Sequence, residues 1–156
     1  MKKPVKIAAI TVSTAAIICG GGFLAWNIID NQPFRLDNEY YAASESVDLN
    51  KDDYEKLIAD KKSFVVMIDK PGCFTTEKMR NNMADFPEDT QFKYYRMMWD
   101  DVKESSLHEY VKFTPSVAII RSGRVKAWLQ ADRDEDSIYF ESGSALKDWI
   151  RKYIIF

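Results

Sequence analysis

The segment SFVVMIDKPGCFTTEKM, residues 63–79, joins the two patterns that decide the fold. Its first part, residues 63–69, is a continuous run of mainly β-branched, aromatic and other apolar side chains, which is typical of a strand covered on both faces of a sheet. Pro71 and the glycine after it end that run. From Cys73 to about residue 86, apolar side chains recur at helical spacing. The segment therefore predicts a buried strand, a tight turn and a helix that begins at a cysteine.

The patterns on either side of this segment alternate between strand and helix periods. The predicted strands cover residues 46–49, 63–69, 91–99 and two runs within 114–130, and the predicted helices cover residues 50–62, 73–86, 100–113 and 142–154. Ser122 and Gly123 are a hairpin signal between the last two strands. The order βαβαβαββα predicts an α/β fold, with a central mixed sheet and helices on both faces.

Composition limits the number of domains and the classes of partner. The chain has 156 residues, of which 46% are hydrophobic, so a single core of about 110 residues remains once a membrane segment is set aside. The 22 basic and 24 acidic side chains provide no basic field. Nucleic acid is therefore not a predicted partner.

An uncharged apolar stretch, residues 7–26, follows a short basic start. About 20 residues in a helix span the ~30 Å hydrocarbon core of a bilayer. Lysines precede the stretch and acidic side chains follow it, so the positive-inside rule keeps residues 1–6 in the cytoplasm. We therefore predict a single-pass protein of the cell membrane whose C-terminal domain is extracytoplasmic.

The fate of the apolar stretch has an alternative. Cleavable signal peptides share the basic start, but their apolar part is typically ~7 to 15 residues, and no good small-x-small site follows Trp26. Cys19 faintly resembles a lipoprotein processing site, yet the bulky Ile18 before it fits that processing poorly. Retention as an anchor is the preferred interpretation, and cleavage stays open. Residues 27–44 lack a sustained period and are predicted to be a linker to a domain at residues 45–156.

The order of elements across residues 45–155 resembles that of the thioredoxin superfamily. Cys73 falls at the position of the family's nucleophile, and Thr114 and Pro115 are similar to the family's cis-proline region. Pro115 lies 42 residues beyond Cys73, a separation typical of the family, and residues 142–150 are similar to its terminal helix. In layout the chain is most similar to membrane-tethered bacterial thioredoxin-like proteins, including bacteriocin-transport accessory proteins.

The chain departs from the family at the site itself, which is a degenerate CxxT. Thr76 stands where a CxxC protein has its second cysteine, and a hydroxyl cannot resolve a mixed disulfide. Gly72 replaces the usual Trp, and Phe74 and Thr75 replace Gly-Pro. The family's buried acid falls on Met67.

Elementary chemistry also favours a reactive Cys73. A cysteine at a helix N-terminus is close to unpaired backbone N–H groups and to the positive end of the helix dipole, so its pKa should fall below the ~8.5 of a free thiol. Thr76, three residues on, is predicted to donate a hydrogen bond to the sulfur. The resemblance implies a cis bond before Pro115, so that Thr114, Pro115 and Phe74 are the expected contacts for an extended client segment.

Three interpretations of Cys73 stay open, and enzymatic activity is uncertain. It is a single thiol that exchanges disulfides with a client protein or a small thiol, a remnant in a fold that only binds a secreted or membrane partner, or an inert core residue. We predict no cofactor and no metal. His108 is the only histidine, and DRDED, residues 132–136, lacks both the turn glycine and the final glutamate of a calcium loop. That segment is predicted to be a solvated loop.

Overall fold

The computed structural model of the chain describes residues 32–41, 45–86 and 90–156. The predicted membrane segment, residues 7–26, lies outside these residues, and Cys19 lies outside them as well. Over the part of the chain that is described, no helix has the length and apolar character needed to cross a bilayer.

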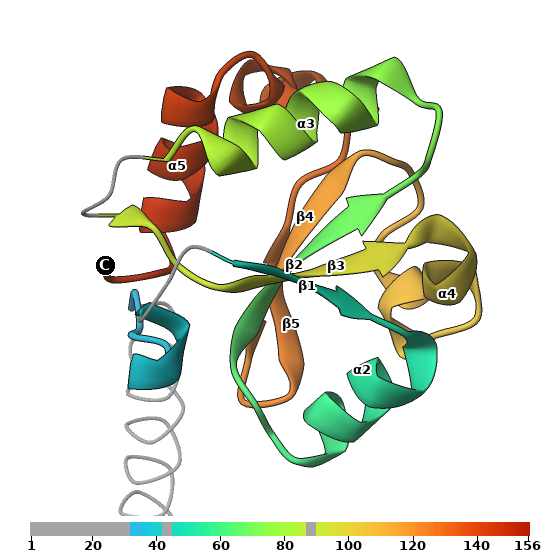
Figure 1. Ribbon diagram of the computed structural model, residues 1–156, viewed down its shortest axis with the longest axis vertical. Coiled ribbons are helices and arrows are strands. Elements are labelled where there is room, and N and C mark those ends of the chain that lie inside the picture. The colour runs from blue at the N-terminus through green and yellow to red at the C-terminus, as the bar shows by residue number, and fades with distance from the viewer. Residues whose placement is uncertain (1–31, 42–44, 87–89) are drawn as a thin grey trace, which may run out of the picture. The chain divides into compact units, whose positions relative to one another are not determined.

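Five strands form one mixed sheet in the order β1-β3-β2-β4-β5 (Figure 1). The strands are β1 (Ser46–Leu49), β2 (Phe64–Asp69), β3 (Tyr94–Met98), β4 (Ser116–Arg121) and β5 (Arg124–Trp128). Strand β3 pairs in parallel with β1 and β2, whereas β4 runs antiparallel to both β2 and β5. The predicted mixed sheet is confirmed.

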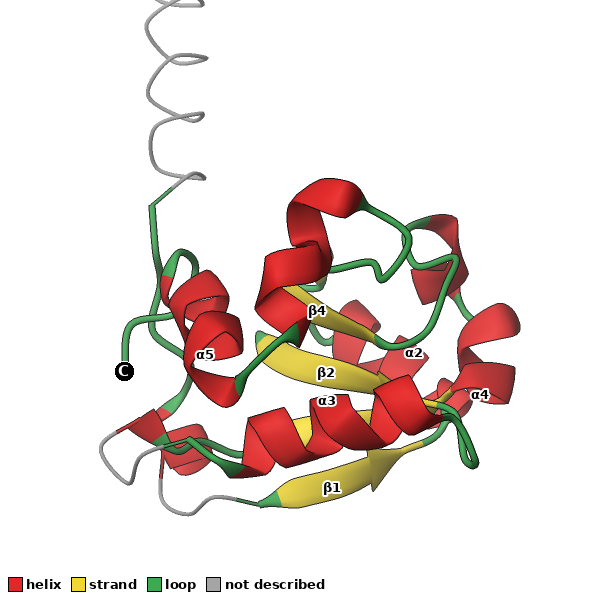
Figure 2. Ribbon diagram, turned by 90° about the horizontal axis from the view of Figure 1, so that it is seen from above, coloured by secondary structure: helices red, strands yellow, loops and turns green. Residues whose placement is uncertain are grey.

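Helices cover both faces of this sheet, as predicted. The helices are α2 (Lys51–Ala59), α3 (Phe74–Ala84), α4 (Trp99–Lys103) and α5 (Gly143–Arg151), with 3-10 turns η1 (Asn38–Tyr41), η3 (Ser106–Glu109) and η4 (Asp134–Phe140). In Figure 1, α3 and α5 lie over one face, and α2 and α4 lie over the other. In Figure 2, seen from above, α3 runs in roughly the same direction as β1 and β2.

Strand β2 is the centre of the core, because neighbouring strands and helices cover it on every side. All six of its residues are buried, which confirms the interpretation of its continuous apolar run. Alternate side chains face the two helix layers. Phe64 packs edge-on against Tyr54 of α2 and Tyr95 of β3, with ring centroids 6.1 and 5.4 Å apart. Asp69 points to the opposite face of the sheet from Phe64 and contacts Arg80 of α3.

The hairpin between β4 and β5 forms at the predicted turn. Ser122 and Gly123 both have positive φ, 50° and 73°, which is the backbone of a two-residue type I′ turn. Glycine is required at the second position, because a Cβ there would lie 2.3 Å from the carbonyl oxygen of Ile58.

The predicted helix over residues 100–113 is shorter and broken, with α4 followed by the 3-10 turn η3. The cause is local competition for backbone groups. The Ser105 hydroxyl donates to the carbonyl of Val102 at 2.9 Å, and the backbone N–H of Ser106 donates to the Glu55 carboxylate at 2.7 Å. These bonds replace the helical ones that a continuous helix would need.

Part of the predicted linker, residues 27–44, packs onto the domain. Leu36 and Tyr40 are buried, with 3% and 2% of their surface exposed. Phe34 forms a parallel bridge with Ile154, next to the C-terminus. The compact unit therefore begins within the predicted linker, at Pro33. The absence of a helical or strand period hid this packing, since isolated apolar side chains on an irregular segment make the contacts.

Candidate functional site

Cys73 stands at the first turn of α3, where the segment after β2 turns into the helix. It is the N-cap residue and has extended backbone angles, φ −97° and ψ 117°. Its carbonyl accepts the first helical hydrogen bond from the N–H of Glu77 at 3.1 Å, and its own N–H donates to the carbonyl of Lys70 at 3.3 Å. The thiol is unpaired and the residue is half-buried. The predicted placement at a helix N-terminus is confirmed.

The surroundings of the sulfur favour the thiolate. The Thr75 hydroxyl lies 3.0 Å from Sγ of Cys73. This hydroxyl is the largest of the effects that lower the pKa of Cys73 to about 7, and the side chain and backbone N–H of Thr76 follow. Donors at a helix N-terminus stabilise negative charge, so the backbone and the first-turn threonines act in the same direction.

The hydroxyl in contact with the sulfur at 3.0 Å belongs to Thr75, and the predicted donor Thr76 is the next largest cause of the lowered Cys73 pKa. Thr76 is fully buried, and its hydroxyl has no hydrogen-bond partner among the described residues. Its side chain faces the core along with Met79 and Met83 of the same helix. The side chain and the backbone N–H of Thr76 both lower the Cys73 pKa, whereas the exposed Thr75 makes the 3.0 Å contact. A helix period places Thr76 on the inward face, but it does not say which hydroxyl turns back to the N-cap.

A pKa near 7 has a modest effect on the rate of attack. At pH 7 about half of the Cys73 thiols are ionised, against roughly 3% for a free thiol of pKa ~8.5. Intrinsic nucleophilicity falls as the pKa falls, with a Brønsted slope of about 0.4 to 0.5, so the net gain is only about threefold. The lowered pKa also makes Cys73 a better leaving group from a mixed disulfide.

Thr75→Val should raise the Cys73 pKa toward the free-thiol value, because it removes the hydroxyl that contributes most to the shift. Since only the thiolate reacts, the rate of iodoacetamide alkylation rises with pH, with a midpoint near 7 in the wild-type chain. The midpoint should move upward in Thr75→Val and less in Thr76→Val. Equal midpoints in the wild-type chain and Thr75→Val would contradict the assignment.

The predicted client-contact residues Thr114 and Pro115 lie at the same edge of the sheet as the Cys73 segment. The Thr114–Pro115 peptide bond is cis, as expected. Ile68, near the end of β2, pairs with Ser116, at the start of antiparallel β4. The segment that follows β2 and the segment that precedes β4 therefore lie at the same end of the two strands. Thr114 is half-buried and Pro115 is buried, so Thr114 is the more accessible of the two.

Two aromatic side chains at this edge are open to solvent. Phe74, directly after Cys73, is 80% exposed, and Phe113, directly before Thr114, is 49% exposed. Phe74 was among the predicted contacts, but Phe113 was not. A signal for Phe113 was present, because it stands next to the Thr-Pro pair.

An ionic cluster around the buried carboxylate of Asp69 lies under α3 and was not predicted from the sequence. Asp69, at the end of β2, is only 2% exposed, and both of its oxygens lie 3.0 Å from Nη2 of Arg80 on α3. Nε of Arg96 lies 3.9 Å from Asp69, and Nη2 of Arg96 lies 2.6 Å from Asp48 on β1. A carboxylate that ends a buried strand was the available signal, since such a group needs a cationic partner.

The remaining polar candidates have structural contacts. Nδ1 of His108 lies 3.0 Å from the carbonyl oxygen of Val111, and its ring packs edge-on against Trp99. In the DRDED segment Asp132, Asp134 and Glu135 are exposed, as predicted for a solvated loop, whereas Asp136 is buried in the 3-10 turn η4 and accepts the N–H of Gln130 at 3.0 Å. Among the described residues, no three His, Cys, Asp or Glu side chains cluster as metal ligands do.

Solved structures share the architecture described above. The chain superimposes on thioredoxin from Schistosoma mansoni with a TM-score of 0.52 and 18% identity, over 71% of this chain and all of that one. Thioredoxin from Plasmodium falciparum gives 0.52 and 15%, over 69% and 97%. Trxlp from Edwardsiella tarda gives 0.50 and 13%, over 68% and 98%. The chain has a thioredoxin-like fold.

This likeness concerns the fold alone, because the identities are low. Neither a protein-family model nor a curated protein matches the sequence. The thioredoxin-like fold implied by the resemblance is confirmed. What the chain does with that fold depends on its own site.

Proposed function

We propose that this chain is a membrane-anchored, extracytoplasmic thioredoxin-like protein that exchanges disulfides with a client protein through Cys73 alone. The observation that carries the proposal is the half-buried sulfur at the N-terminus of α3, with the Thr75 hydroxyl at 3.0 Å and a pKa of about 7. These donors favour the thiolate form, which an inert cysteine of the core does not use. The apolar residues 7–26 support the anchor, and their flanking charges support the orientation.

The proposed step conserves atoms and electrons. The Cys73 thiolate attacks one sulfur of a client disulfide R–S–S–R′, forming Cys73–S–S–R and expelling R′–S⁻, which takes a proton from water. The Thr75 hydroxyl stabilises the attacking thiolate, together with the side chain and the backbone N–H of Thr76. Because position 76 carries no thiol, the mixed disulfide lasts until an external thiol attacks it.

A second candidate function is non-covalent binding of a partner at the same edge of the sheet, with no disulfide exchange. The 80% exposure of Phe74 beside Cys73 supports an adaptor that holds a secreted or membrane partner. The partner would lie against Phe74 and the accessible backbone at Thr114, as in strand addition. The resemblance of the sequence to membrane-tethered bacterial thioredoxin-like proteins, including bacteriocin-transport accessory proteins, is compatible with either function.

Capture of mixed disulfides from intact cells separates the two functions. Cells expressing the full-length chain are quenched with N-ethylmaleimide, and the complexes are resolved without reductant and identified by mass spectrometry. We expect reducible complexes with the wild-type chain and none with Cys73→Ser, while Cys19→Ser keeps them. Non-covalent capture that is unchanged in Cys73→Ser, with no reducible complex in the wild-type chain, would support the adaptor and sink the exchange proposal.

A further inference from the structure

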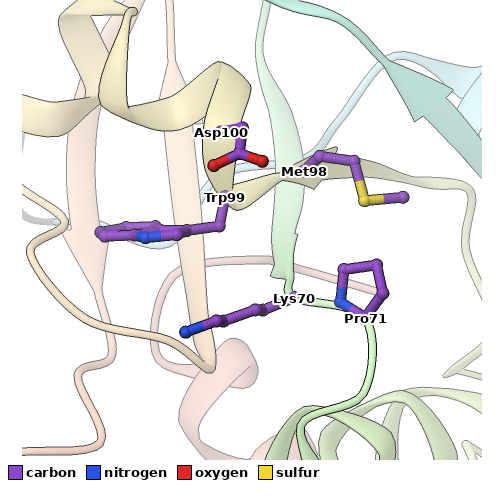
Figure 3. A pocket seen from close by; sticks show the side chains of 5 residues that line it. All are labelled: Lys70, Pro71, Met98, Trp99 and Asp100. Carbon is purple, nitrogen blue, oxygen red and sulfur yellow. The ribbon is translucent and has the colours of Figure 1, made fainter.

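The two ends of the sheet differ in the balance of their charges. Beyond the carboxyl ends of β2 and β3, Lys70 and Asp100 line one crevice of about 390 Å³, so opposite charges meet there (Figure 3). The hydrogen bond from Lys103 lowers the pKa of Asp100 most, and the charge of Lys70 lowers it further. The opposite end of the sheet, where β2 begins and β4 ends, carries mainly basic side chains.

These basic side chains come from two turns. The turn between α2 and β2 carries Lys61 and Lys62, and the turn between β4 and β5 lies between Arg121 and Arg124. Asp60 is the one acidic residue of the two turns. In Figure 1 both turns are at the bottom of the domain, whereas α3 lies across its top. We call the two lysines and two arginines the basic end.

Backbone contacts hold the two turns of the basic end together. The N–H of Gly123 donates to the carbonyl of Lys62 at 2.9 Å, and the N–H of Ser122 donates to the Ser63 hydroxyl at 2.9 Å. Three members of the basic end are exposed, and among the described residues these three have no ion-pair partner within 4 Å. Like charges held together repel one another, so an anionic surface is the complementary partner.

Lys61 occupies a backbone position that favours glycine. Its φ is 55°, in the left-handed region. Its N–H donates to the carbonyl of Ile58, and the N–H of Lys62 donates to that of Leu57, both at 3.0 Å. This pair of bonds closes a helix C-terminus, and glycine is the usual residue at the left-handed position. The chain thus keeps a basic side chain where a glycine would be less strained.

The chain length to the predicted membrane segment limits how far the basic end lies from a bilayer. From Trp26 to Pro33, where the compact unit begins, there are seven residue steps, which span at most about 25 Å. The Arg121 guanidinium lies 5.0 Å from the centre of the Phe34 ring, so the basic end is next to the start of the unit. A linker of this length allows the basic end to approach head groups within the Debye length of ~8 Å.

We propose that the basic end docks on the anionic phospholipid head groups of the bilayer that holds residues 7–26. The inference rests on the membrane anchoring in the proposed function. Lipid phosphates accept charge-assisted hydrogen bonds from lysine and arginine. The segment that carries Cys73 follows the other end of β2, after roughly 17 Å of strand. Docking therefore turns Cys73 and the exposed Phe74 away from the membrane, toward clients outside it.

The test uses the full-length chain with Cys19→Ser and Cys73→Ser, reconstituted in lipid nanodiscs. One cysteine for a fluorophore is introduced by Ala59→Cys, at an exposed residue next to the basic end, or by Lys78→Cys, on the exposed side of α3. Nanodiscs of phosphatidylcholine alone are compared with nanodiscs that also contain phosphatidylglycerol. Both contain a lipid with a nitroxide on its head group, which quenches a fluorophore only at close range.

With phosphatidylglycerol present, we expect at least about threefold more quenching in Ala59→Cys than in Lys78→Cys. The difference should disappear with phosphatidylcholine alone, and also at about 1 M salt, where the Debye length is ~3 Å. It should disappear as well when Lys61, Lys62 and Arg124 are all replaced by glutamine. Each cation near an anionic surface favours docking roughly fivefold, so three together shift the equilibrium about a hundredfold.

The matched control in the Ala59→Cys form combines Lys78→Gln, Lys103→Gln and Lys112→Gln, which neutralise three exposed lysines outside the basic end. Its quenching should equal that of the parent. Equal quenching at the two labelled positions, or a difference that persists when the basic end is neutralised, would overturn the docking inference alone. A chain recovered free of lipid after reconstitution would overturn the membrane anchoring and the inference together.

Lys61→Gly separates the charge from the fold. The melting temperature should stay the same or rise, because glycine adopts the left-handed backbone without strain. Quenching in Ala59→Cys should nevertheless fall, because one cation of the basic end is lost. A lower melting temperature with unchanged quenching would contradict the proposal, because it would assign the lysine to the C-terminal dipole of α2.

Discussion

Thr76→Cys is expected to shorten the life of a Cys73 mixed disulfide by roughly a hundredfold or more, without any added thiol. A thiol in the first turn of the same helix reacts as an intramolecular group, with an effective concentration far above the millimolar level of an external thiol. The Cα atoms of residues three apart in a helix are about 5 Å apart, within the range that a disulfide spans. The product should be a free client and a disulfide between positions 73 and 76.

The structure indicates that position 76 tolerates this change. The Thr76 hydroxyl is buried with no hydrogen-bond partner among the described residues, so the loss of its oxygen removes no hydrogen bond that the structure describes. The measurement is the decay of a labelled-peptide mixed disulfide on non-reducing gels, with the chain's mass as the check for the new disulfide. Lys78→Cys is the control, because it places an exposed thiol five residues along the helix, on another side. A long-lived mixed disulfide in Thr76→Cys would show that position 76 does not lie where a resolving thiol must.

Arg80→Met is expected to lower the free energy of unfolding by about 2 to 3 kcal/mol. It leaves the carboxylate of Asp69, only 2% exposed, with Arg96 at 3.9 Å as its remaining close cation. Breaking a fully buried pair costs ~3–5 kcal/mol, and the estimate is lower here because the Arg80 side chain is 40% exposed. Thermal or urea unfolding of the chain measures the change, and the melting temperature should fall by about 10 °C.

A second substitution distinguishes two causes of the lost stability, an unpaired buried carboxylate and lost packing of the arginine side chain. The double variant Asp69→Asn with Arg80→Met should recover part of the loss, because no ionised group then remains buried without its partner. Arg151→Met serves as the control, since that arginine is 47% exposed and lies 3.9 Å from Asp148, so its removal should cost less than about 0.5 kcal/mol. Loss of equal size in the single and double variants would assign the effect to packing of the arginine chain.

The first of these predictions concerns a residue identified from the sequence, and the second concerns a contact that only the structure shows. Thr76 was identified from its spacing to Cys73, because the first turn of a helix is a local structure and residue spacing determines which side chains share a face. The pairing of Asp69 with Arg80 joins a strand to a helix, and no local period records such a contact. Prediction from sequence therefore placed Thr76 in the first turn beside Cys73, but it did not find the ionic contacts of Asp69 under the same helix.

The sequence by itself determined the buried strand, the turn, the cysteine at the start of a helix and the hairpin at Ser122 and Gly123. Each of these follows from side-chain period or turn chemistry within a few residues. Only the tertiary structure decided that Thr75 and not Thr76 contacts the sulfur, that Leu36 and Tyr40 draw part of the linker into the core, and that a crevice opens beside Lys70. The reason is physical: these features arise from contacts between segments far apart in the chain, or from the turn of one side chain, and neither leaves a repeating pattern in the order of residues.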